Sequence, residues 1–173
     1  DFAPISVLSE VLGSTPSGRL HKALVESKKA TGAGADAFGM AEPGYLLFSA
    51  DLRKSDAASE ARKTLLDVIE NSQRKPVTEQ EVTVAKASLL NDFEKTVNDP
   101  ARLGIALSES IAKGDWRLFF LYRDRIEAVT AADQPALAGQ EGKVQAHRLY
   151  GALFFGAVKL VEALEDQLPA EAL

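Results

Sequence analysis

The chain has 173 residues, of which 46% are hydrophobic and 26% charged, a composition and length that suit one soluble domain with a proper core, or one domain and a fragment. Its net charge of −5 argues against a nucleic-acid partner, whose phosphates need clustered lysine and arginine. The absence of cysteine excludes disulfides and cysteine metal sites, and it fits the cytosol and the periplasm equally well.

The first 30 residues predict two helices joined by a loop. Apolar residues recur at helical spacing after Pro4, and Gly13 ends this first helix. Ser17 is the expected N-cap of the second helix, which carries Leu20 and Leu24 on one face.

The next segment predicts either a strand or a loop, and a clear strand follows it. Residues 30–40 contain several glycines and fit either a weak, close-packed strand or a loop. Residues 45–52 alternate between two faces, which indicates a half-buried strand. The expected core face of this strand carries Leu46, Phe48, Ala50 and Leu52.

The pattern of apolar residues and capping residues predicts four further helices. Thr78 and Glu81 form a capping box, in which each side chain satisfies a free amide of the other residue. The four expected starts are Ser55 or Asp56, Thr78, Asp99-Pro100 and Trp116. One more helix after Thr130 is interrupted by Pro135.

The helix expected from Trp116 to Val129 has an aromatic stripe that includes Phe119 and Phe120. Core packing is its expected role, with a domain interface as the alternative. The expected order of elements is helices, at most two strands, and then more helices. This order predicts an α+β fold. We expect an antiparallel sheet with helices packed on one face and a helix-rich second half.

Five segments, in the same order, resemble the pitrilysin/insulinase family of zinc metallopeptidases. The longest spans residues 8–34 and reads LSEVLGSTPSGRLHKALVESKKATGAG. The other four are residues 44–48, 77–90, 114–117 and 125–133. The resemblance covers residues 1–133, which we take as a fragment of an inactive peptidase-type domain.

The resemblance implies a domain without catalytic residues. In this family, homologous α+β domains enclose an extended peptide, and only one of them binds zinc through an H-x-x-E-H helix. The two histidines of this chain, His21 and His147, do not stand in such a motif. We therefore expect no metal ligand and no cofactor here, with zinc in a homologous partner domain of a parent metallopeptidase. The alternative is a structural or assembly module with the same fold and no proteolytic role.

Two residues are candidates for contact with a peptide substrate. Some domains of the family hold substrate through the arginine and tyrosine of a REKRGLAY segment; Lys28 stands at the arginine and Gly32 at the tyrosine. The resemblance thus suggests Arg19 and Lys28 as substrate-binding residues. In the alternative interpretation, the Lys28 side chain is solvated and contacts no substrate. Arg19 then holds its own loop in place by hydrogen bonds to backbone carbonyls.

Residues 134–173 depart from the family pattern. We assign residues 134–143 to a linker and residues 144–173 to a strand–strand–helix tail of uncertain origin. Through residues 150–156, YGALFFG, this tail resembles the start of the STAS domain of sulfate-type anion transporters. Either two unrelated pieces join near Gln134, or the apolar tail replaces missing strands of the first domain.

The second alternative arises because the family strand expected before Asp1 is absent, which would leave an open sheet edge. The chain also lacks an initiator methionine and a recognisable signal peptide, so it looks like a piece of a larger protein. No membrane span is expected, since the longest apolar run, residues 151–164, is short and contains Lys159 and Glu162. The cellular compartment stays open.

Overall fold

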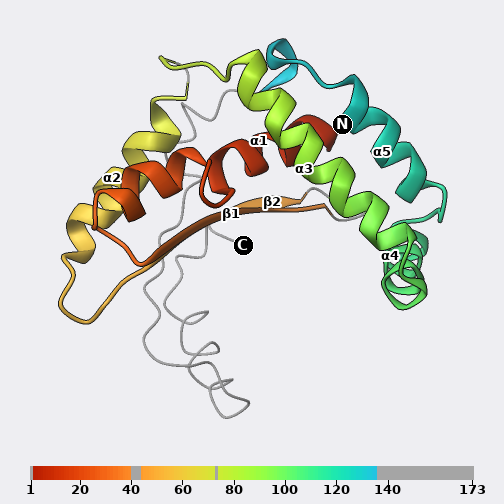
Figure 1. The fold of residues 1–173 in the computed structure, drawn as a ribbon, viewed down its shortest axis with the longest axis horizontal. Helices are drawn as coiled ribbons and strands as arrows, with labels where there is room; N and C mark the ends of the chain where they lie inside the picture. The colour runs from red at the N-terminus through yellow and green to blue at the C-terminus, as the bar shows by residue number, and fades with distance from the viewer. Residues whose placement is uncertain (1, 40–43, 73, 136–173) are drawn as a thin grey trace, which may run out of the picture. The chain divides into compact units, whose positions relative to one another are not determined.

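The computed structural model describes residues 2–39, 44–72 and 74–135 (Figure 1). The elements, in chain order, are α1 (Ala3–Gly13), η1 (His21–Glu26), β1 (Gly32–Phe38), β2 (Tyr45–Asp51), α2 (Ala58–Glu70), α3 (Glu79–Val97), α4 (Pro100–Ala112), α5 (Leu118–Ala128) and η2 (Ala131–Asp133). The expected tail, with His147, and most of the expected linker lie outside the described residues. None of the helices in the described part is both long and apolar enough to span a bilayer.

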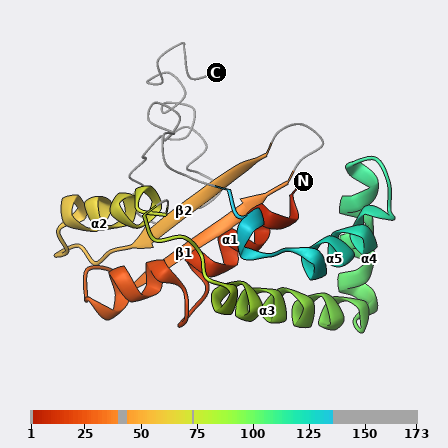
Figure 2. The same cartoon turned by 90° about the horizontal axis from the view of Figure 1, so that it is seen from above.

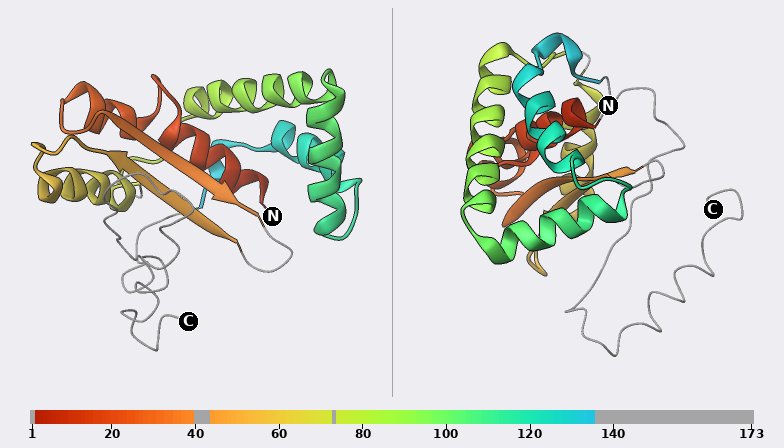
Figure 3. Two further views of the ribbon diagram at one scale, coloured as in Figure 1. Left: turned by 90° about the horizontal axis from the view of Figure 1, so that it is seen from below. Right: turned by 90° about the vertical axis from the view of Figure 1, so that its right-hand side faces the viewer.

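The sheet is an antiparallel hairpin of β1 and β2. Gly32 lies opposite Asp51 and Phe38 opposite Tyr45. The helices α1 and α3 lie on one side of this hairpin (Figures 1 and 2). From below, the two strands lie in front of α1 (Figure 3). The predicted α+β class, with helices on one face of an antiparallel sheet, is therefore confirmed.

The glycine-rich segment is a strand, which settles the choice between strand and loop. Its small side chains let α1 approach the backbone of β1 very closely. Ser9 Oγ donates a hydrogen bond of 2.7 Å to the carbonyl oxygen of Ala35. A Cβ atom added at Gly13 would lie only 2.3 Å from the amide nitrogen of Ala35. Close packing of a helix therefore compensates for the weak strand propensity of this sequence.

The core forms around α1 and the segment after it, with the hairpin on one side and α3 packed against α1. The β2 face predicted to point inward does so, because Phe48, Ala50 and Leu52 pack against the core while Tyr45 and Leu47 are exposed. Burying each large aliphatic side chain contributes about 1.5–3 kcal/mol. The largest fully buried side chains are Leu8, Leu12, Leu20, Leu24, Ile126, Val7 and Val82.

Two of the expected helices begin where local capping chemistry predicts. Thr78 Oγ1 accepts from the Glu81 amide at 3.2 Å, and the Glu81 carboxylate accepts from the Thr78 amide at 2.9 Å. These bonds form the capping box at the start of α3. At the start of α4, Asp99 Oδ1 accepts from the amide of Ala101 at 2.9 Å. Both signals consist of the N-cap residue and the first turn of the helix that they start.

Two other helices begin two or three residues later than predicted, each after a turn in which an aspartate carboxylate accepts a backbone amide. Asp56 Oδ2 accepts from the Arg53 amide at 2.9 Å, and α2 begins only at Ala58. Asp115 Oδ1 accepts from the Arg117 amide at 2.9 Å, and α5 begins at Leu118. In the described residues that follow Thr130, which end at residue 135, the chain forms the short 3-10 segment η2.

The helix α3 also holds the end of α5 in place. Lys86 Nζ donates to the carbonyl oxygens of Glu127 at 2.6 Å and Val129 at 2.9 Å. A lysine beside the last carbonyls of a helix satisfies acceptors that have no partner within the helix and complements the helix dipole. Ile126, fully buried, fixes the same end by packing.

The aromatic stripe of α5 is only partly buried, so the prediction of core packing is wrong for Phe120, and Trp116 just before the helix is also exposed. Trp116 is 52% exposed and Phe120 37% exposed. Their rings contact each other edge-on, with centroids 6.0 Å apart. Phe119 instead stacks on Phe93 of α3, with ring centroids 4.5 Å apart. The helix thus directs Ile126 and Tyr122 toward the core, stacks Phe119 on α3 and leaves Phe120 exposed. The interface alternative for the exposed rings stays a prediction.

Candidate functional site

Both candidate residues lie on the segment between α1 and β1. Arg19 lies two residues before the π-helical turns of η1, and Lys28 lies two residues after them. Leu20 and Leu24 anchor this segment, since both side chains are completely buried. The sequence predicts a helix here, but nothing in its spacing indicates the wider π-helical form.

Arg19 bonds to two parts of the segment that leads into α3. Its Nε and Nη2 donate to the two carboxylate oxygens of Glu81, each at 2.7 Å, in a bidentate pair. Its Nη1 donates to the carbonyl oxygen of Lys75 at 2.6 Å, and Nη2 donates to that of Pro76 at 2.9 Å. These bonds use four of the five N–H donors of the guanidinium. The structure therefore shows the backbone contacts that the alternative interpretation of Arg19 expected.

Glu81 is the acceptor at the centre of this network. Besides Arg19, its Oε2 accepts from the amide and the hydroxyl of Thr78, each at 2.9 Å. The hydrogen bonds from Arg19, followed by those from Thr78, lower the pKa of Glu81 to about 2, although partial burial acts in the opposite direction. The capping glutamate thus serves twice, in the N-cap of α3 and as the anchor of Arg19.

Lys28 occupies a backbone conformation that usually belongs to glycine. Its φ is 62°, the one positive value recorded for a non-glycine residue in the described part. The Lys29 amide donates to the Leu24 carbonyl at 2.9 Å, and the Lys28 amide donates to the Val25 carbonyl at 3.0 Å. These two bonds are those of a Schellman motif, with Lys28 at the left-handed position. The Lys28 side chain itself is exposed.

Replacing Lys28 by glycine should raise the free energy of unfolding by about 0.5–1 kcal/mol, because glycine adopts φ near 60° without a Cβ penalty. Chemical denaturation of the two proteins measures this change. Lys28→Ala is the control, since it removes the ammonium group but keeps the Cβ, and it should give no such gain. An equal gain in both variants would attribute the effect to charge instead of backbone conformation.

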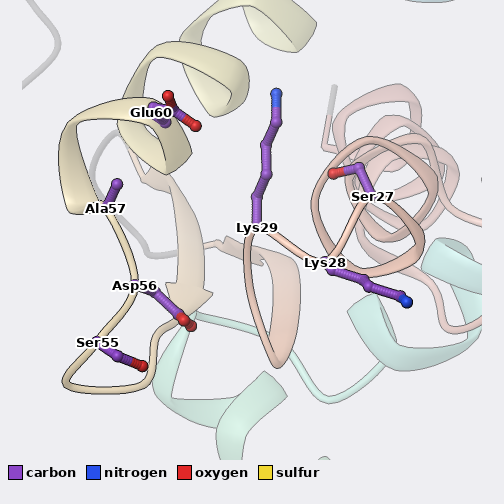
Figure 4. Close-up of a pocket in the computed structure, with 7 residues that line it drawn as sticks. All are labelled: Ser27, Lys28, Lys29, Ser55, Asp56, Ala57 and Glu60. Carbon is purple, nitrogen blue, oxygen red and sulfur yellow. The ribbon is translucent and has the colours of Figure 1, made fainter.

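Lys28 and Lys29 also line an open depression of about 370 Å3 beside the start of α2 (Figure 4). In this view the Lys28 side chain points away from Asp56 and Glu60. The Lys29 ammonium donates instead to Thr64 Oγ1 of α2 at 2.8 Å. Because its lining includes both ammonium and carboxylate groups, the depression favours neither an anionic nor a cationic ligand.

The residues around His21 do not fit a zinc ion. The positions four residues before and after it are Ser17 and Val25, and neither side chain supplies the second imidazole of an H-x-x-E-H helix. Among the residues that the structure describes, no group of three or more His, Asp or Glu side chains is placed to hold a metal ion.

Comparison with known proteins gives one family match and several structural matches. A family model described as the peptidase M16 inactive domain matches residues 1–89. The inactive peptidase domain of a protein assigned as a zinc protease from Bordetella parapertussis is 38% identical, with a TM-score of 0.71, and the match covers 76% of this chain and 72% of that chain. No curated protein matches the chain significantly.

Two further solved structures are similar. A protein assigned as a zinc protease from Bordetella pertussis Tohama I is 37% identical, with a TM-score of 0.68, over 76% of this chain and 73% of that one. A protease from Helicobacter pylori has the same TM-score of 0.68 at only 19% identity, over 76% of this chain and 32% of that one. The last match shows a shared fold alone.

Proposed function

This chain belongs to the family of peptidase M16 inactive domains, and we propose that it serves as a scaffold and peptide-chamber domain of a zinc metallopeptidase. The resemblance to pitrilysin/insulinase metallopeptidases is thereby confirmed, and the chain is a non-catalytic domain. The observation that carries the proposal is the 38% identity to an inactive peptidase domain over three quarters of the chain.

The proposed partner is a homologous domain that binds zinc and carries the catalytic residues. Support comes from the relatives, which are assigned as zinc proteases and include a domain that is itself inactive. Zinc would act in the partner, and an extended peptide would lie between the two domains. This division of roles needs no metal ligand from the present chain.

Within this proposal, Lys28 is the residue suited to contact the peptide, and Arg19 holds the segment that carries it. The Lys28 side chain is exposed and can reach a peptide carboxylate or carbonyl. Arg19 is 20% exposed and uses most of its donors within the domain. The two candidates therefore differ in role, one as a contact and the other as a support.

Mixing the full chain with the zinc-bearing domain of the same protein tests the proposal. Cleavage of a fluorogenic peptide should rise strongly in the mixture compared with the zinc domain alone. Lys28→Ala should raise KM with kcat little changed, as expected for a contact made equally in the ground and transition states. Lys22→Ala, which removes another exposed lysine of the same segment, is the matched control and should leave KM unchanged.

The alternative, an assembly module with no proteolytic role, predicts a different outcome of this experiment. The two domains would associate, but the rate of cleavage would stay that of the zinc domain alone. The exposed rings of Trp116 and Phe120 are the observation that favours an association surface. Association without any gain in cleavage would therefore reject the peptide-chamber role and support the assembly role.

A further inference from the structure

We draw no further inference here: the strongest candidate, the patch of exposed aromatic rings that Trp116 and Phe120 form at the start of α5, carries none because nothing in the structure shows what covers it.

Discussion

Replacing Gly13 by alanine should lower the free energy of unfolding by about 3 kcal/mol, the upper end of the usual cost of overpacking. The added methyl group would lie 2.3 Å from the amide nitrogen of Ala35 and 2.9 Å from its Cα. These are backbone atoms of β1, so no side chain can rotate away to relieve the clash. Relief requires α1 and β1 to separate, which would disturb the Ser9–Ala35 hydrogen bond and the core beneath α1.

Gly104→Ala is the matched control, because Gly104 also lies in a helix but has open space where the methyl group would be. Alanine there should raise stability by about 0.5–1 kcal/mol through its higher helix propensity. Urea denaturation of both variants measures the difference. If Gly13→Ala were as harmless as Gly104→Ala, the close contact between α1 and β1 would be disproved.

Replacing Arg19 by alanine should cost about 2–3 kcal/mol, since it removes charge-assisted hydrogen bonds and leaves the partly buried Glu81 carboxylate without its main partner. The bonds in question join the segment before η1 to residues 75, 76 and 81. Arg19→Lys should recover only a small part of the loss, because an ammonium cannot reproduce the planar fork of the guanidinium. Denaturation of the single variants, of Glu81→Gln and of the double variant gives the coupling energy.

The same network should make this loss depend on pH. The pKa of Glu81 in the folded protein, about 2, lies below its ordinary value of 4.5. The stabilisation is therefore complete above pH 4.5 and is lost as the pH falls toward 2. The stability gap between the wild type and Arg19→Ala should narrow over that range.

Arg117→Ala provides the comparison, because the Asp115–Arg117 pair is exposed and should contribute little at any pH. A gap between wild type and Arg19→Ala that stayed constant down to pH 2 would show that Glu81 is not the titrating partner. If Arg117→Ala lowered the free energy of unfolding as much as Arg19→Ala, the Arg19–Glu81 network would contribute no more stability than an exposed ion pair.

The elements predicted correctly from the sequence are those whose signals are local. The capping box of Thr78 and Glu81 spans four residues, and Asp99-Pro100 marks the start of α4 in two. The alternation in residues 45–52 fixes which face of β2 is buried without reference to any other element. In each case the residues that determine the structure lie beside those that adopt it.

The features that could not be predicted depend on contacts between distant residues. β1 is a strand because β2 pairs with it and α1 packs on its glycine and alanine residues, not because its sequence favours strands. The partner of Arg19 lies 62 residues away, so no spacing in the sequence indicates it. Trp116 and Phe120 have helical spacing, but whether such a stripe is buried depends on which elements cover it.

The central claim, that this is a non-catalytic domain of a zinc metallopeptidase, is tested most directly by isothermal titration of the full chain with zinc, paired with a peptide-cleavage assay on the titrated protein. We predict no stoichiometric, tight zinc binding and no cleavage by the chain alone. Zinc bound tightly at one ion per chain, together with peptide cleavage that a chelator abolishes, would contradict the assignment.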